Sequence, residues 1–247
     1  RGARLVRDGN EYAPLEYEKR RYWLLLYAPL VVYMLRTYGR ALDATMTVVA
    51  PIAERYKREF GFDPLIVMNT PKLVPLPPKR AVDPAQIHLI HHGGANRDRH
   101  LELMIETLAQ TDNRFRLHFI LVDGPPEYVQ WLKDLAPRLA PGRITFHDPV
   151  PPAAIVARIA EYDIGFFLLK PVNYSYEVAL PNKFFDFLAA GLAVCIGPLP
   201  AMAALVTQYH CGCVAPCVDA ADVAAVLNRL SAGRVHPCAE GGGAGAR

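Results

Sequence analysis

Short apolar runs alternate with longer amphipathic segments from residue 87 onward. The runs are rich in Ile, Val, Leu and Phe, as strands buried on both faces of a parallel sheet are. The predicted strands are residues 87–91, 117–122, 144–147, 163–169 and 193–196. The predicted helices are residues 99–109, 127–136, 153–161, 182–190, 202–209 and 219–230, the last with Asp219 as its N-cap. This alternation predicts an α/β fold with a doubly wound sheet.

The first 68 residues show a shorter version of the same alternation. They predict a helix from residue 16 to about 40, a strand at 45–49, a helix at 51–60 and a strand at 65–67. This is too little to close a domain, so we interpret it as the last part of an N-terminal Rossmann-like domain.

Five prolines fall within residues 69–84, which argues against a helix or a central strand there and indicates an interdomain linker. The predicted organisation is thus a remnant at 1–68, the linker at 69–84, a complete domain at 85–232 and a low-complexity tail at 233–247.

Composition narrows the class of protein. The 247 residues are 52% hydrophobic, yet no apolar run reaches the roughly 18–20 residues of a membrane span. No secretory leader is recognisable in the opening residues. The five cysteines are an odd number without regular spacing, which indicates reduced thiols and a cytoplasmic setting.

Charge is spread unevenly along the chain. Residues 1–80 carry 14 Lys and Arg against 8 Asp and Glu, whereas the rest carries 13 against 16. Ordinary solvated surface explains this, and the alternative is contact with an anionic surface such as the inner face of a membrane. The apolar stretch 23–35, flanked by Arg20, Arg21 and Arg36, has the same two interpretations. Its apolar residues surround the whole helix, which favours packing against protein.

Candidate ligand-binding residues follow the first strand of the complete domain. Gly93 and Gly94 allow close approach of backbone to a ligand, and Arg97 and Arg99 fall where the next helix is predicted to start. This pattern is typical of an anion site at the carboxyl edge of an open sheet. The alternative is an ordinary tight turn with two solvated arginines.

A second candidate lies at the start of the predicted helix 182–190. Asn182 is predicted to cap the helix through its side chain. Lys183 falls in the first turn, where a cation is unfavourable unless an anion is bound, and Asp186 follows on the same face. These residue types suit a phosphate and a pair of sugar hydroxyls. The alternative is a surface ion pair worth a few tenths of a kcal/mol.

The segment ALPNKFFDFLAAGLAV resembles the hallmark segment of group 1 (family 4-like) glycosyltransferases of the GT-B fold. The segments HHGGANRDRHLELMIETL, ITFHDPVPPAAIVARIAEYDIGFFLL and CGCVAPCVDAADVAAVLNRL resemble further family segments in the right order. Upstream, DATMTVVAPIAERYKREFGFDPLIVMNTP resembles the end of the family's N-terminal domain and the crossover, so the likeness covers roughly residues 40–230. The resemblance implies a retaining enzyme that moves a sugar from a nucleotide-diphosphate sugar to a glycan, lipid or small-molecule acceptor. It also implies that most of the N-terminal, acceptor-side domain is absent from this chain.

The family's pair of glutamates maps only in part onto this chain. The second glutamate, a ribose ligand in the family, falls on Asp186, which is shorter by one methylene. The first falls on Val178, so the neighbouring Glu177 is a stand-in. Asn10 stands where the family has an acceptor-side histidine.

The resemblance also assigns roles on the phosphate side. The backbone at Asn182 and Lys183 corresponds to the diphosphate-binding turn, and Arg99 to a phosphate contact. The residues expected to act in catalysis are Lys183, Arg99 and Glu177. Those expected to bind the donor are Asp186, Asn182, Gly93, Gly94 and Arg97.

No cofactor or metal is expected beyond the donor, which is a co-substrate. The adjacent His91 and His92 should point to opposite faces of a strand, which argues against paired chelation. The cysteines at 211, 213 and 217 are only a weak indication of zinc.

Two other functions stay open at this point. One is a nucleotide-sugar 2-epimerase of the same fold, and the other is an inactive nucleotide-binding remnant. The expected partners are the donor, a glycan or lipid acceptor and a peripheral membrane contact, with no nucleic acid.

Overall fold

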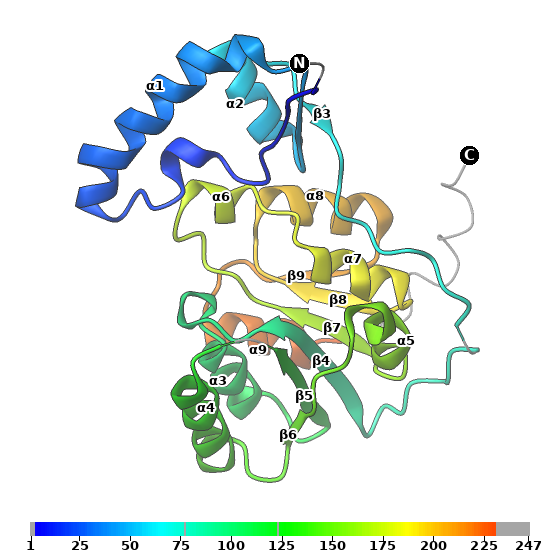
Figure 1. The fold of residues 1–247 in the computed structure, drawn as a ribbon. Helices are drawn as coiled ribbons and strands as arrows, with labels where there is room; N and C mark the ends of the chain where they lie inside the picture. Colours follow the sequence, from blue (N-terminus) through cyan, green and yellow to red (C-terminus); the bar gives the residue numbers. More distant parts are fainter. Residues whose placement is uncertain (1–2, 77, 123, 231–247) are drawn as a thin grey trace. The chain divides into compact units, whose positions relative to one another are not determined.

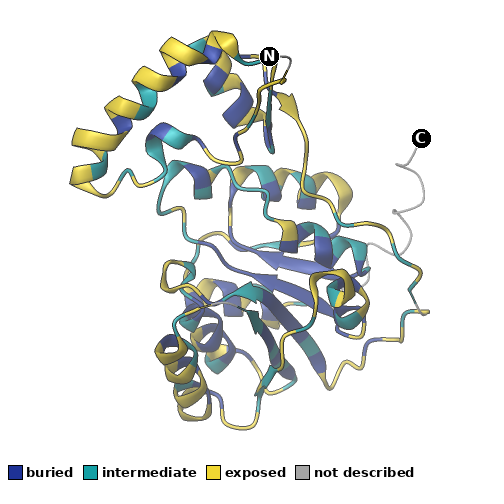
Figure 2. Cartoon of the chain, viewed as in Figure 1, coloured by how far each residue is buried: buried dark blue, intermediate teal, exposed yellow. Residues whose placement is uncertain are grey.

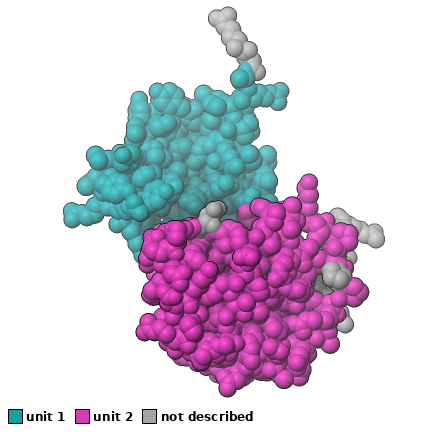
Figure 3. All heavy atoms as spheres, turned by 60° about the horizontal axis from the view of Figure 1, so that its bottom comes forward, with its two compact units in different colours: residues 1–69, 171–180 teal, residues 70–170, 181–247 magenta. Residues whose placement is uncertain are grey.

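The structure is a computed structural model, and it describes residues 3–76, 78–122 and 124–230. Two units emerge from the contacts within the chain (Figure 3). Unit 1 comprises residues 1–69 and 171–180, and unit 2 comprises residues 70–170 and 181–247. The sequence pattern did not predict that residues 171–180 belong to the first unit. The predicted domain boundaries stay a prediction.

Unit 2 is built on a six-stranded parallel sheet with the order β6-β5-β4-β7-β8-β9. Its strands are β4 (Ile87–Gly94), β5 (Phe115–Val122), β6 (Ile144–His147), β7 (Ile164–Phe167), β8 (Ala193–Ile196) and β9 (Gly212–Val214). Strands β5 and β6 follow one another to one side of β4, and β7, β8 and β9 follow one another to its other side, so the strand order reverses between β4 and β7. In open α/β sheets, ligands bind at the carboxyl ends of the strands at such a point. The predicted doubly wound α/β sheet is confirmed.

Helices cover both faces of this sheet (Figure 1). On one face lie α3 (Glu102–Gln110), α4 (Pro126–Leu139) and α9 (Ala220–Asn228). On the other lie α5 (Ile155–Ile159), α7 (Asn182–Ala189) and α8 (Pro200–Tyr209). Strands β7 and β8 are fully buried between the two layers, and β4 and β5 are largely buried (Figure 2). The edge strands β6 and β9 are partly exposed.

The start of the helix after β4 differs from the prediction. Arg97–Arg99 form a 3₁₀ turn, His100 has a left-handed backbone with φ 51°, and α3 begins only at Glu102. The prediction that the helix starts at Arg99, with Arg97 and Arg99 at its start, is therefore wrong. A left-handed residue interrupts the helix, and an apolar periodicity does not reveal such a break.

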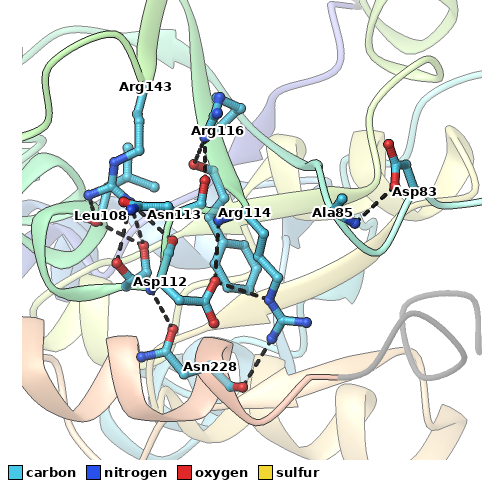
Figure 4. A network of polar contacts seen from close by, with 11 residues as sticks. Asp83, Ala85, Leu108, Asp112, Asn113, Arg114, Arg116, Arg143 and Asn228 are labelled. Atoms are coloured by element: carbon cyan, nitrogen blue, oxygen red, sulfur yellow. Dashed lines mark hydrogen bonds and ion pairs between the residues drawn. The ribbon is translucent and has the colours of Figure 1, made fainter.

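Polar contacts fix the end of the sheet opposite the carboxyl edge (Figure 4). The guanidinium of Arg143 donates to the carbonyls of Leu108 and Asp112. Arg114 donates to the Asp112 carboxylate and to the carbonyl of Asn228. These bonds tie the turn between α3 and β5 to the end of α9, at the edge of the sheet opposite the carboxyl ends of the strands.

The proline-rich segment is anchored to unit 2 at its far end. Lys79 Nζ donates to the carbonyls of Ala160 and Tyr162, and Arg80 pairs with the fully buried Asp163 at 3.1 Å. Asp163 also accepts from the backbone N–H of His88 at 2.7 Å. These contacts therefore hold the proline-rich segment against the N-terminal ends of β4 and β7.

Unit 1 has a three-stranded parallel sheet in the order β1-β2-β3. Its elements are β1 (Val6–Asp8), α1 (Ala28–Tyr38), preceded by a π-helical stretch (Trp23–Tyr27), β2 (Ala44–Thr47), α2 (Ala50–Phe60), β3 (Leu65–Ile66) and α6 (Tyr174–Glu177). The helix predicted from residue 16 starts only at residue 21. No helix among the described residues is both long enough and apolar enough to cross a bilayer.

Buried aromatic residues hold unit 1 together. Its core gathers Tyr12, Leu35, Tyr56 and Phe62, and the Tyr56 hydroxyl accepts from the backbone N–H of Ala13. Further contacts bring in the returning segment, because the Tyr174 N–H donates to Glu18 at 2.9 Å and its hydroxyl donates to the Pro51 carbonyl. Long-range bonds of this kind explain why residues 171–180 belong to this unit.

Three histidines form a chain across β4, β5 and β6. His88 Nδ1 lies 2.8 Å from His118 Nε2, and His118 Nδ1 lies 2.9 Å from His147 Nε2. Burial lowers the pKa of all three imidazoles, that of His118 to about 3. Neutral imidazoles suit this arrangement because each ring then has one donor and one acceptor nitrogen.

The histidine chain predicts a loss of stability in acid. A histidine whose pKa is lower in the folded state than in the unfolded state stabilises the fold above pH 6.5, and that contribution is lost as the pH falls toward 3. His118→Phe should lower stability at pH 7 but reduce the further loss between pH 7 and 4.5 by about 1–2 kcal/mol. Urea titrations at both pH values measure this. Tyr162→Phe, which removes only a hydroxyl 3.3 Å from His147, should keep the full acid dependence. An unchanged slope in His118→Phe would contradict the account.

Candidate nucleotide-sugar site

The candidate site lies where the end of β4 faces the start of α7, at the point where the strand order reverses. Helix α7 is held firmly at its place on the sheet. The Phe187 ring packs directly over Gly165 of β7, where a Cβ would lie only 2.2 Å from the ring. At its other end the N–H groups of Gly191 and Leu192 donate to Leu188 and Phe187, which closes the helix with a left-handed glycine. These contacts hold α7 on the sheet and define where the helix ends.

Lys183 is buried in the first turn of α7 and its ammonium group points at the end of β4. Nζ lies 3.5 Å from His91 Nε2 and 4.9 Å from the centroid of the Phe167 ring. His91 donates from Nδ1 to the Phe166 carbonyl at 3.0 Å, so its Nε2 carries the lone pair that faces the lysine. The predicted alternative of an exposed Lys183–Asp186 surface pair is wrong, because both side chains are buried.

The backbone at Gly93 lies close beside this lysine. Its φ of 112° is a conformation that favours glycine, and a Cβ there would lie 3.0 Å from Lys183 Nζ. Glycine can adopt this backbone conformation without strain, and because it has no Cβ it leaves room beside the ammonium group. Gly94 follows as the last residue of β4.

Asp186 lies one turn further along α7 and faces His92. Its Oδ2 is 3.5 Å from His92 Nε2, which has no hydrogen-bond partner among the described residues. Burial and the positive charge of Lys183 lower the pKa of His92 to about 3, so this imidazole is neutral and the contact is not an ion pair. The sequence pattern missed His92 as a site residue, although its place just before the two glycines was a signal.

A cavity of about 150 Å³ opens beside these two side chains. Apolar side chains form most of its wall, together with Gly93 and the polar groups of His92 and Asp186. The apolar residues are Ile120, Val122, Val150, Pro152 and Ile155. A flat apolar group with a polar edge fits such a lining.

Burial shifts the pKa of both charged groups in the site. It lowers the pKa of Lys183 to about 7, and the positive charge of Arg99 adds to this while Asp186 opposes it. Burial raises the pKa of Asp186 to about 6, against the opposing effect of Lys183. The ammonium form of Lys183 is thus poorly compensated without a ligand, and a bound anion would restore it.

The other predicted site residues lie at varied places. Asn182 is the exposed first residue of α7, but Pro181 is the N-cap and no side chain caps the helix, so the predicted Asn182 cap is wrong. Arg99 lies near enough to Lys183 to affect its pKa. The guanidinium of Arg97 stacks on the Tyr128 ring of α4 at 5.0 Å. Glu177 is exposed at the end of α6 in unit 1.

The described residues contain no group of three or more His, Cys, Asp or Glu side chains that could hold a metal ion. Cys213 interacts with the buried Cys195, and Cys217 Sγ donates to Asp222 at 2.6 Å. Cys238 lies outside the described residues. The expectation that the reaction needs no metal stays a prediction.

Comparison with known proteins gives a result only at the level of structure. No protein-family model matches the sequence, and no curated protein is significantly similar to it. Staphylococcus aureus TarM, solved with UDP and α-GlcNAc-glycerol, superposes with a TM-score of 0.74 at 8% identity over 96% of this chain and 46% of TarM. Anabaena HepE with UDP-glucose gives a TM-score of 0.68 at 13% identity over 95% of this chain and 66% of HepE.

A third similar structure is the pneumococcal O-GlcNAc transferase GtfA with UDP and GlcNAc, with a TM-score of 0.53 at 11% identity over 83% of this chain and 42% of GtfA. All three are GT-B glycosyltransferases, so the fold is of the GT-B type. The chain spans less than two thirds of the length of each of these proteins.

Removing the charge of Lys183 should stabilise the empty protein. A lysine whose pKa is lowered on folding destabilises the fold fully below about pH 7, and this cost fades as the pH rises toward 10.5. Lys183→Met should therefore raise stability at pH 7 by about 1–3 kcal/mol and reduce the rise of stability with pH, leaving the part that comes from the half-buried Lys79, whose pKa is lowered to about 8.

Urea titrations of both proteins between pH 6.5 and 9.5 measure this difference. Lys133→Met, on the exposed face of α4, is the matched control and should leave the pH profile unchanged. A Lys183→Met protein that is less stable at pH 7 would show that the charge is already compensated in the empty site.

Proposed function

We propose that this chain carries the donor-binding part of a retaining glycosyltransferase that resembles group 1 enzymes of the GT-B fold. The observation that carries the proposal is Lys183, a buried cation in the first turn of α7 with a pKa lowered to about 7. Cations are unfavourable at the N-terminus of a helix, and burial adds to the cost. A bound anion would offset both costs, because it would stabilise the ammonium group of Lys183.

A nucleoside diphosphate supplies the anion that this site lacks. Its phosphates would lie between the start of α7, Lys183 and the backbone at Gly93, with the charge of Arg99 close by. When the bond to the sugar breaks, negative charge grows on the diphosphate, and fixed positive groups stabilise that charge as it forms. The lysine, the arginine and the free N–H groups of α7 would share this task.

The nucleoside would occupy the cavity beside the phosphates. Asp186 has two acceptor oxygens, which suit the two hydroxyls of a ribose. The apolar wall formed by Ile120, Val122 and Val150 would receive a flat base. We propose UDP as the donor nucleotide to test first, because TarM, HepE and GtfA have all been solved with UDP or a UDP-sugar.

The finer features of the reaction are part of the same proposal. Retention of configuration, a glycan or lipid acceptor and the absence of a metal rest on the resemblance of residues 179–194 to group 1 enzymes. The stand-in role of Glu177 and the phosphate role of Arg97 rest on it as well. The expected cytoplasmic location, with peripheral membrane contact, is also proposed.

Calorimetric titration with UDP, GDP and ADP tests the donor site directly. UDP should bind, and Lys183→Met and Asp186→Asn should each weaken binding at least tenfold, because each removes a group that contacts the phosphates or the ribose. Asp186→Glu should bind within a few-fold of the original protein, since it keeps the carboxylate.

The Lys133→Met protein serves as the control and should bind UDP normally. Product analysis with labelled UDP-sugars then separates transfer or hydrolysis from epimerisation. No nucleotide binding to a protein shown by circular dichroism to be folded would contradict the proposal.

A pair of glycine variants separates the geometry of the site from general backbone strain. Gly93 and Gly142 both have positive φ, but only a Cβ at Gly93 would approach Lys183, whereas nothing lies within 4 Å of one at Gly142. Gly93→Ala and Gly142→Ala should both lose about 1 kcal/mol of stability. Only Gly93→Ala should weaken UDP binding, by tenfold or more.

Denaturation curves and UDP titrations of the two variants measure both effects. Equal UDP affinity in the two alanine variants would show that Gly93 does not border the phosphate site.

A further inference from the structure

The outer side of the first long helix in unit 1 is an exposed apolar surface. The helix runs without interruption through residues 21–38. Its inner side packs on the core of unit 1 through Val31 and Leu35. Much of the ribbon of this helix is yellow in Figure 2, the colour of exposed residues. Nine large apolar side chains are exposed around it: Tyr22, Leu24, Leu25, Leu26, Tyr27, Leu30, Tyr33, Met34 and Tyr38. We call these nine residues the apolar helix surface.

The degree of exposure is high for side chains of this size. Leu25 is 71% exposed and Leu26 is 67% exposed. Isolated exposed leucines are ordinary, but nine large apolar residues exposed on one helix mark a surface that contacts something apolar. Tyrosines make up four of the nine residues, and Trp23 stacks on Tyr27 with ring centroids 5.5 Å apart. Trp and Tyr are the residues that favour the boundary between lipid tails and water.

The charge around this surface has one sign. Between residues 19 and 42 the chain has five basic residues and no Asp or Glu. They lie at the two ends of the helix: Lys19 and Arg20 precede it, Arg21 is its first residue, Arg36 lies in its last turn and Arg40 follows it. A second copy of this surface would bring like charges together, whereas an anionic lipid surface complements them.

The helix has the dimensions of one that lies flat in a membrane interface. Eighteen helical residues span roughly 27 Å. The described residues include no helix that could cross a bilayer. Arginine and lysine can keep their charged heads at the level of lipid phosphates while their stems and the neighbouring apolar residues reach the acyl chains.

We propose that the apolar helix surface docks unit 1 onto an anionic lipid bilayer, with the helix in the plane of the interface. The leucines and tyrosines of the surface enter the acyl boundary, and the basic residues at both ends contact lipid phosphates. This docking depends on unit 1 alone and is independent of the donor site in unit 2.

Vesicle co-sedimentation tests the proposal. The full chain should bind vesicles of phosphatidylcholine with one third phosphatidylglycerol at least tenfold more tightly than pure phosphatidylcholine, and added salt should weaken the binding. Leu25→Gln with Leu26→Gln, and separately Arg21→Gln with Arg36→Gln, should each weaken it about tenfold or more. Leu73→Gln is the control, since Leu73 is 86% exposed but lies outside this helix.

Fluorescence provides a second readout from the helix itself. The chain has two tryptophans, so a Trp131→Phe protein reports on Trp23 alone. Its emission should shift to shorter wavelength with anionic vesicles and stay unchanged with neutral ones.

Three outcomes would overturn the proposal, provided that circular dichroism shows each variant folded. They are equal binding to neutral vesicles, binding that the Leu25→Gln and Leu26→Gln pair leaves unchanged, and no vesicle binding at all. In the last case, self-association abolished by the same leucine pair would identify a second copy as the occupant. A monomer without vesicle affinity would identify another protein surface instead.

Discussion

The ammonium group of Lys183 sits in surroundings that oppose its charge, and the arrangement of unit 2 around it follows from this constraint. Burial, the start of a helix and the charge of Arg99 all act against protonation, and Asp186 compensates only in part. The fold holds the lysine there because Phe187 fixes α7 on Gly165 and because Gly93 leaves room beside Nζ. The buried charge of Lys183 lowers the stability of the fold, and a bound anion would compensate that charge. Such local destabilisation is common at functional sites.

The two ends of the sheet differ in a way that supports this account. At the amino ends of the strands, Arg143 and Arg114 have their partners within the protein, in the carbonyls and carboxylates of the nearby turns. At the carboxyl ends, His92 Nε2 has no hydrogen-bond partner among the described residues and Lys183 is only partly compensated. Buried polar groups are normally satisfied, so groups left unsatisfied beside a cavity indicate where a ligand binds.

Much of unit 2 could be predicted from the sequence, because buried parallel strands are continuous apolar runs. The bounds of β6 and β8 agree with the prediction, and Asp219 caps α9 by accepting from Ala221. The errors fall where single residues decide the backbone. The left-handed His100 delays α3, and Pro181 rather than Asn182 precedes α7. β9 is three residues long and was missed.

The charged residues of the candidate site could be predicted from the sequence, but the burial of their side chains could not. The pattern Pro-Asn-Lys before an apolar helix pointed to Lys183 and Asp186, and the structure places both on α7 facing the end of β4. The sequence did not show that both are buried, that His92 faces Asp186, or that the Arg97 side chain stacks on Tyr128. Such facts depend on contacts between distant segments, and local periodicity carries no information about them.

Proton uptake on UDP binding tests the central claim most directly. A lysine with a pKa near 7 is largely neutral at pH 8, and a bound diphosphate would draw a proton onto it. Titrations at pH 8 in HEPES and in Tris, two phosphate-free buffers with different ionisation enthalpies, give the number of protons taken up. The account predicts an uptake approaching one proton, falling toward zero at pH 6. UDP binding at pH 8 without proton uptake would contradict it.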